Sequence, residues 1–165
     1  LDIKYLDSLE LGLQEAAQFL AKSIARDGEG ASCLIEVIVK GANQSSEAHQ
    51  IAKIIAGSPL VKTAIHGCDP NWGRIVAAIG RSGVSCQTDD ISLWIGCYQL
   101  IERGQPLSFE RSRVSKYIRQ RMEGEYLHDD CVSITLDLGK GSGSGFAWGC
   151  DMSAEYVRIN ADYTT

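Results

Sequence analysis

The sequence predicts an α/β fold (α+β in the broad sense) with a mixed β-sheet flanked by helices, and three patterns carry this prediction. Apolar residues recur at helical spacing from Leu9 to Ile24, which indicates one apolar stripe on a helix. The β-branched run over residues 33–39 is typical of a central strand. Apolar and polar residues alternate over residues 131–138, as in a strand with one buried face. Because helices and strands mix along the chain, a mixed sheet is favoured over a doubly wound parallel one.

Capping and turn residues mark where the expected elements begin and end. Asp7 or Ser8 can cap the first helix, and Gly28 can stop it. Residues 60–65, which follow Pro59, fit either a helix or a strand. Helical spacing predicts further helices over residues 48–55, 72–79 (capped by Asn71), 109–122 and 155–160 (capped by Ser153). Strand patterns predict further strands over residues 91–95, 98–102 and 146–150.

A glycine–serine segment, residues 139–145, joins the strand over residues 131–138 to the strand over residues 146–150. We therefore expect these two strands to pair as a hairpin. A phosphate-binding loop is the alternative for this segment, but it requires a glycine six residues before Lys140, where the sequence has Ile134. The segment also leads into a strand rather than a helix, so a flexible hairpin loop is favoured.

Length and composition limit the class of protein. The 165 residues suit a single unit, with a leading helix over residues 1–28, an α/β core over residues 31–150, and a C-terminal helix and tail over residues 151–165. The chain is 44% hydrophobic and 22% charged, which excludes intrinsic disorder. A net charge of -5 disfavours nucleic-acid binding, and no apolar run approaches the ~18 residues of a membrane span. Since the chain begins at Leu1 rather than Met, we expect a processed product or a cut fragment.

The cysteine pattern indicates free thiols. Six cysteines occur without a C-x-x-C pair, which disfavours a zinc ribbon or a redox dithiol. A core of this size needs no disulfide, so we expect buried free thiols in a reducing compartment. The six stand at positions 33, 68, 86, 97, 131 and 150.

Two groups of polar residues favour structural interpretations. The basic run over residues 111–121 is flanked by acidic residues, so a solvated helix face is favoured over a nucleic-acid or membrane surface. His66, Cys68 and Asp69 could suggest a nucleophile or a metal cluster. However, a turn follows at Pro70 and no second histidine lies nearby in the sequence, so neither role is favoured.

Two other features suggest ligand binding. Glu29 stands between two glycines, where no neighbouring side chain shields its carboxylate and the backbone can approach a ligand closely. The alternative is a helix stop with an exposed glutamate. The tail, residues 157–165, carries an aromatic ring, apolar residues and hydroxyl groups up to its last residue, which suits docking. Its alternative is a helix end packed on the core.

Four segments, in this order, resemble the β chain of the ornithine acetyltransferase family. They are Arg26-Asp27-Gly28-Glu29-Gly30-Ala31, Ser58-Pro59-Leu60-Val61-Lys62-Thr63-Ala64, Asp69-Pro70-Asn71-Trp72-Gly73-Arg74-Ile75 and residues 156–165. The resemblance covers essentially the whole chain and points to the C-terminal part of the β chain. It implies transfer of acetyl from N-acetylornithine to glutamate in arginine biosynthesis, with acetyl-CoA as a donor in some members. The alternative is a non-enzymatic α/β module that binds or regulates through a small molecule.

The resemblance also implies where the catalytic groups and partners are. In this family a precursor cleaves itself ahead of a threonine, which then acts as the nucleophile with its own amine as base. This chain begins at Leu1, so we expect the nucleophile upstream and expect this chain alone to be inactive. The implied partners are the α chain and the N-terminal part of the β chain, in a heterotetramer of two α and two β chains. No metal, tightly bound cofactor, nucleic acid or membrane is implied, and the expected location is the cytoplasm, or the plastid stroma in a plant.

Three residues match positions of the family that contact the substrate. Glu29 has the same D-G-E-G-A context, and Asn160 and Thr165 match the asparagine and the terminal hydroxyl residue of the closing segment. The resemblance therefore favours the ligand-binding interpretation of both the Glu29 segment and the tail. Four more residues lie in family motifs and are expected to be structural: Lys62, Asp69, Asn71 and Arg74.

Overall fold

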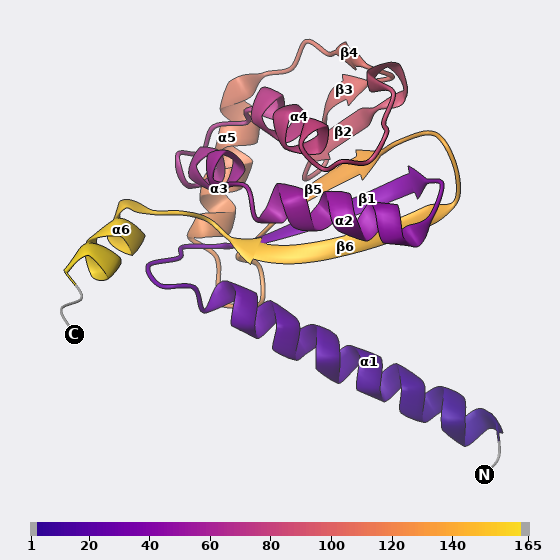
Figure 1. The fold of residues 1–165 in the computed structure, drawn as a ribbon. Helices are drawn as coiled ribbons and strands as arrows, with labels where there is room; N and C mark the ends of the chain where they lie inside the picture. The colour runs from indigo at the N-terminus through magenta and orange to yellow at the C-terminus, as the bar shows by residue number, and fades with distance from the viewer. Residues whose placement is uncertain (1–2, 163–165) are drawn as a thin grey trace.

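The computed structural model describes residues 3–162, which form a mixed β-sheet flanked by helices (Figure 1). This confirms the predicted fold class. The six helices are α1 (Ile3–Arg26), α2 (Ser45–Ala56), α3 (Pro59–His66), α4 (Trp72–Gly80), α5 (Arg111–Met122) and α6 (Ala154–Ala161). The six strands are β1 (Leu34–Ala42), β2 (Ser92–Ile95), β3 (Tyr98–Glu102), β4 (Gln105–Pro106), β5 (Cys131–Asp137) and β6 (Gly143–Cys150).

The strand order is β4-β3-β2-β5-β1-β6, so the predicted hairpin of β5 and β6 is wrong. β1 lies between them, parallel to β5 and antiparallel to β6. The glycine–serine segment therefore crosses the end of β1, where the backbone N–H groups of Lys140 and Gly141 donate to the Gly41 oxygen over 2.8 and 2.9 Å. The apolar β1 gains a neighbour on each side in this way, which the alternation within β5 and β6 alone does not specify.

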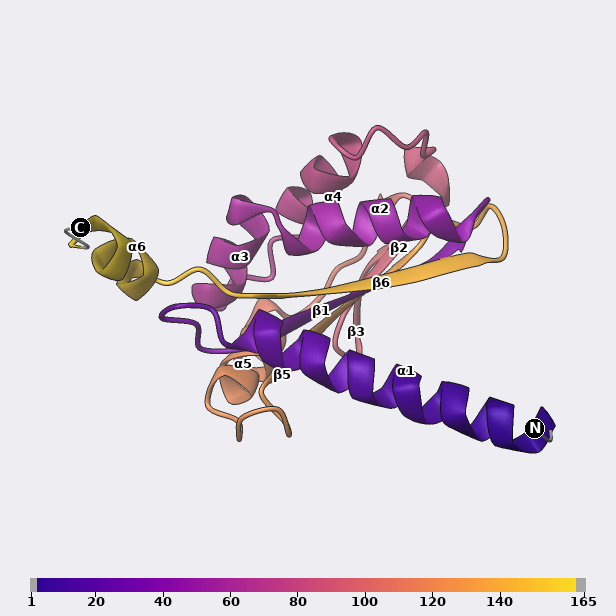
Figure 2. The same ribbon diagram turned by 60° about the horizontal axis from the view of Figure 1, so that its bottom comes forward.

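The helices cover the two faces of the sheet unequally. α2, α3 and α4 lie on one face, and α1 and α5 lie on the other (Figures 1 and 2). The core lies on the α2 side, where Ile35, Val37 and Val39 of β1 are fully buried beside Ile51 and Ile55 of α2. Of the alternate β1 residues, which point to the other face, Glu36 and Ile38 are partly buried and Lys40 is exposed, whereas Leu34 and Ala42 at the two ends of the strand are buried.

The start of α1, the segment after Pro59 and two short elements complete the comparison with the sequence expectations. α1 begins at Ile3, so Asp7 and Ser8 lie inside the helix and neither caps it. Residues 60–65, for which the sequence left a helix and a strand open, form a helix, with Pro59 in its first turn, where a missing N–H is tolerated. The short strand β4 and a 3-10 turn, Thr88–Asp90, carry no apolar periodicity and were not predicted. Within the described residues, we find no helix with the length and apolar character that a membrane crossing needs.

All six cysteines are unpaired. The expectation that they are buried is correct for Cys33 and Cys68, but Cys97 is exposed and the other three are partly exposed. Burial raises the pKa of the Cys33 thiol, and it raises that of Cys131 to about 11. These two thiols therefore stay protonated at neutral pH and pack as small apolar groups.

Candidate functional site

The candidate site lies where the loop between α1 and β1 meets the C-terminal helix α6. The Asn160 side-chain amide donates to Oε2 of Glu29 over 2.7 Å and to the Tyr156 backbone oxygen over 2.9 Å. Glu29 and Asn160 are 131 positions apart in the sequence, so the fold brings together two of the three residues that the family resemblance singles out. The third, Thr165, lies outside the described residues.

Ser153 and Gly30 set the position of α6 against the loop. The Ser153 hydroxyl donates to the Gly30 oxygen over 2.7 Å and accepts from the Tyr156 backbone N–H over 3.1 Å, so it caps α6, as the sequence predicts, and also holds the loop. Gly30 has a φ of 67°, and a Cβ there would lie 2.9 Å from the Ser153 hydroxyl oxygen and from the Tyr156 backbone nitrogen. Only glycine fits this close approach of the loop to the first turn of α6.

Asp151 fixes the other end of the same loop. Its Oδ1 accepts from the backbone N–H groups of Ser32 and Cys33 over 2.7 and 3.0 Å. Its Oδ2 accepts from the Ser32 hydroxyl over 2.6 Å and contacts Nδ1 of His66 at 2.8 Å. Since Asp151 is 3% exposed, this one buried carboxylate joins the loop, α3 and the segment that leads into α6.

Hydrogen bonds decide the charge state of Asp151. Burial alone would raise the pKa of this carboxyl group. The hydrogen bonds from Ser32, Cys33 and His66 outweigh burial and hold its pKa below the ordinary value of 3.8. The carboxylate is therefore ionised at neutral pH, when it accepts all four contacts.

Arg26, at the end of α1, holds the backbone of this loop by hydrogen bonds. It pairs with the buried Asp130, and its guanidinium donates to the Ala31 and Ser32 backbone oxygens over 3.0 and 3.1 Å. The first residue of the Arg26–Ala31 motif thus shapes the backbone that presents Glu29. Glu29 itself is exposed, and one of its two carboxylate oxygens accepts from Asn160.

Of the four residues expected to be structural, Asn71, Arg74 and Asp69 make structural contacts through their side chains, and Lys62 contributes its backbone oxygen. The Asn71 side chain caps α4 by accepting from the Arg74 backbone N–H over 3.3 Å. Arg74 donates to the Leu60 oxygen over 2.9 Å and so joins α4 to α3, where the Lys62 backbone oxygen accepts from Met152. Asp69 pairs with Arg111 of α5 at 2.6 Å.

Asp151 was not predicted from the sequence, and no role was predicted for His66. His66 and Cys68, which flank Gly67 at the end of α3, do not form a nucleophilic pair: His66 turns to Asp151, and the Cys68 sulfur donates to the Met122 sulfur at 3.5 Å. An aspartate directly after a strand and two residues before a helix cap was the signal available for Asp151. Its partners lie 85 to 119 positions away, which no local pattern reveals. Nowhere in residues 3–162 do three His, Cys, Asp or Glu side chains gather as a metal would require.

The fold and the site define a class: mixed α/β proteins that carry a polar site outside the sheet, on a loop and a C-terminal helix. The family model described as "ArgJ family" matches residues 3–165, and the chain belongs to this family. This confirms the resemblance stated from the sequence motifs.

Relatives and a solved structure agree with this family. The "Arginine biosynthesis bifunctional protein ArgJ" of Prochlorococcus marinus (strain NATL2A) is 58% identical over 165 residues, which are 100% of this chain and 39% of the relative. The protein of the same name from Synechococcus sp. (strain ATCC 27144 / PCC 6301 / SAUG 1402/1) is 56% identical over 96% of this chain and 38% of its own length. The crystal structure of "Arginine biosynthesis bifunctional protein argJ" from Bacillus halodurans aligns with a TM-score of 0.88 and 45% identity, over 95% of this chain and 70% of that chain. The chain thus spans about two fifths of the length of these curated relatives, at their C-terminal end.

Proposed function

We propose that this chain is the C-terminal part of the β chain of a glutamate N-acetyltransferase, and that it supplies one wall of the substrate pocket. Membership of the ArgJ family supports the reaction class, since the relatives are named as bifunctional proteins of arginine biosynthesis. The observation that carries the proposal is the contact between Glu29 and Asn160, which joins an exposed carboxylate to an amide at one edge of the molecule.

The proposed reaction is acyl transfer through an ester on a threonine that lies outside this chain. The threonine hydroxyl attacks the acetyl carbonyl of N-acetylornithine, the C–N bond breaks, and ornithine leaves with the proton. The free amine of glutamate then attacks the ester, the C–O bond breaks, and the threonine hydroxyl is restored. Acetyl-CoA is proposed as a second donor, which would load the same hydroxyl by breaking its thioester. These steps need no metal or bound cofactor from this chain.

The role proposed for Glu29 follows from the charges of the substrates. N-acetylornithine carries a side-chain ammonium group that takes no part in the transfer, and an ionised carboxylate is the side chain that pairs with it. Asn160 holds one oxygen of Glu29 and leaves the other for the ligand. The Thr165 hydroxyl, which can donate and accept, is proposed to complete this wall of the pocket.

The remaining parts of the enzyme are also proposals. We propose that the α chain and the N-terminal part of the β chain complete the site, in a heterotetramer of two α and two β chains. A match of 39% of the relative's length, at its C-terminal end, supports a larger precursor. Six unpaired cysteines support a reducing location, which we propose is the cytoplasm, or the plastid stroma in a plant.

The test is Glu29→Gln in the complete enzyme, with Glu102→Gln as the matched control. Glutamine keeps the acceptor for Asn160 but removes the charge that pairs with the ligand ammonium. Glu102 is an exposed glutamate of β3, far from this loop along the sheet. We expect Glu29→Gln to cost about 2–5 kcal/mol in kcat/KM for acetyl transfer from N-acetylornithine to glutamate, with Tm unchanged. We expect Glu102→Gln to leave both values unchanged.

Two results would contradict this role. Full activity of Glu29→Gln would show that the charge of Glu29 does not contribute to substrate binding. A large drop in Tm would show that Glu29 has a structural role. A complete protein that binds these amino acids but transfers no acetyl group would favour the non-enzymatic module.

A further inference from the structure

The long helix α1 carries an apolar stripe that its own domain does not cover. Every described side chain from Tyr5 to Leu20 is exposed, and α1 reaches the sheet only through its last turns (Figures 1 and 2). The large apolar members of the stripe are all exposed: Leu6 47%, Leu9 57%, Leu13 62%, Leu20 59% and Ile24 77%. Contiguous apolar surface of this kind marks an interaction site.

The stripe faces away from the sheet because the opposite side of α1 is anchored to it. Lys22 pairs with Glu36 of β1 at 3.2 Å, and Arg26 pairs with Asp130. Ile24 follows Lys22 by two positions, which is about 200° around a helix, so it points roughly opposite to this anchored side. Helices on a domain surface normally turn their apolar stripe inward. The inverted orientation of α1 is what requires a partner.

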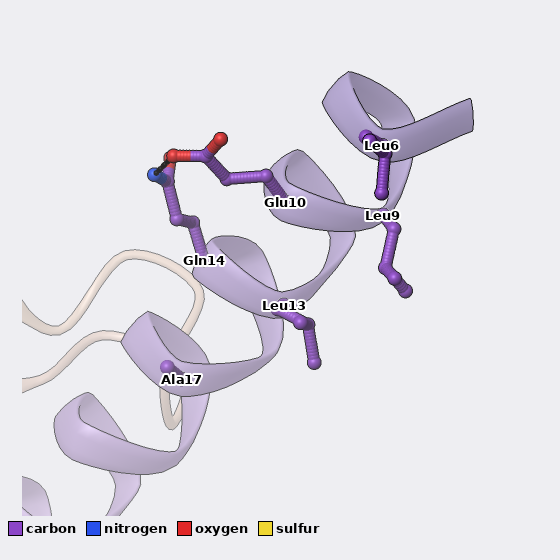
Figure 3. A pocket seen from close by; sticks show the side chains of 6 residues that line it. All are labelled: Leu6, Leu9, Glu10, Leu13, Gln14 and Ala17. Atoms are coloured by element: carbon purple, nitrogen blue, oxygen red, sulfur yellow. Dashed lines mark hydrogen bonds between the residues drawn. The ribbon is translucent and has the colours of Figure 1, made fainter. Parts of the chain in front are cut away.

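The stripe continues into an apolar hollow beside the edge strand β6. Leu6, Leu9 and Leu13 point to one side of α1, while Glu10 and Gln14, joined by a 3.1 Å hydrogen bond, point to another (Figure 3). Two shallow grooves meet on this helix and share Gln14 and Ala17. One groove is lined by the leucines. The other is the hollow beside β6, called the β6 hollow below, which is lined by His49 and the aromatic pair Phe146 and Trp148.

We propose that the polypeptide which precedes Leu1 in the complete protein covers this surface, the outer stripe of α1 together with the β6 hollow. The inference rests on the proposed function, because that function requires such a preceding part. Two observations select this occupant over a second copy of the chain. The curated relatives extend well beyond the match, and the match lies at their C-terminal end. The stripe begins at the very end of α1 to which a preceding segment would be joined.

Because the preceding polypeptide is covalently joined to α1, it can cover the stripe even if its own affinity for the stripe is low. A segment joined to the first turn of α1 is held near the stripe at a local concentration of order millimolar. A second copy would need to bind through the same stripe at its concentration in solution. Burial of the leucines against the preceding segment would also fix the direction of α1, which carries Arg26 and hence the backbone that presents Glu29.

The test measures thiol labelling in the complete protein, with Leu13→Cys against Leu60→Cys. These leucines have similar exposure, 62% and 55%, but Leu60 lies on α3, on the other face of the sheet. The exposed Cys97 is an internal reference in both variants. We expect the thiol at position 13 to label at least about tenfold more slowly than the thiol at position 60, at every protein concentration. Equal labelling rates would overturn the proposal, as would protection that disappears on dilution, because dilution would separate a second copy.

A cross-link identifies the occupant. A photoreactive side chain at position 9 of the complete protein should give cross-linked peptides from residues that precede Leu1. Cross-links to residues 3–162 of another copy, or none at all, would contradict the proposal. Neither readout uses acetyl transfer, so the interface and the proposed function can fail separately.

Discussion

Asp151 positions the candidate site although it is not itself a proposed ligand contact. Four hydrogen-bond contacts from the loop backbone, Ser32 and His66 converge on its two oxygens in a buried setting. An ionised group in this position is stable only while its partners remain, since a buried charge without partners is costly. The network therefore holds the loop in one conformation, in which Glu29 meets Asn160.

Replacing Asp151 should destabilise the protein strongly. Asparagine offers one acceptor oxygen instead of two, and its amide would face the Ser32 hydroxyl or His66 as a competing donor. We expect Asp151→Asn to lower the free energy of unfolding of the complete protein at pH 7 by about 3 kcal/mol, measured by urea denaturation. Glu102→Gln, at an exposed position, should change it by less than about 0.5 kcal/mol.

The wild type and Asp151→Asn should also differ in how their stability depends on pH. The folded-state pKa of Asp151 lies below its ordinary value of 3.8, so its contribution to stability is fully present above that value. It is lost as the pH falls through the folded-state pKa. The stability gap between wild type and Asp151→Asn should therefore be constant above pH ~5 and shrink below pH ~4. A gap that widens on acidification would contradict the assigned direction of the pKa.

At the scale of elements, α6 depends on polar contacts rather than on the core. None of its residues is buried, and its attachment to the loop consists of the Ser153 and Asn160 hydrogen bonds. A helix of this length is marginal without such support. The candidate site thus includes an element whose order is set by a few side chains.

Ser153→Ala should loosen α6 while leaving the core intact. Loss of the cap costs about 1 kcal/mol, so the helix should open locally about five times more often. Hydrogen exchange of the α6 amides in the complete protein should rise accordingly, with little change in Tm. Ser112→Ala is the control, because the Ser112 hydroxyl of α5 donates to Glu110 and caps no helix. Unchanged α6 exchange in Ser153→Ala would show that other contacts hold the helix.

The sequence specified most elements but not how they assemble. The periodicity of apolar residues and the capping residues located β1, α2, α4 and α5, because these patterns are local. The strand partners of β5 and β6 could not be read in this way, since β1 enters between them from almost 100 positions away. The Glu29–Asn160 pair was expected through the family motifs, whereas the Asp151 network depends on contacts across the whole chain.

At the scale of the whole molecule, the described chain is well packed on one side and open on the other. The α2 side of the sheet holds the buried core, while the outer stripe of α1 and the aromatic pair on β6 lie exposed. The candidate site stands at the end of α1 where the loop begins. A complete enzyme would therefore place its nucleophile and its remaining pocket walls against a chain that already presents the Glu29–Asn160 pair.

The most direct test of this account is a double-mutant cycle of Glu29→Ala and Asn160→Leu, each of which removes the contact between the two side chains, read as kcat/KM for acetyl transfer by the complete enzyme. If the two side chains act as one unit, each single variant loses activity and the double variant loses less than the sum, with a coupling energy of about 1–3 kcal/mol. Additive losses would mean that the 2.7 Å contact does not serve the reaction, and wild-type activity in all three variants would contradict the site itself.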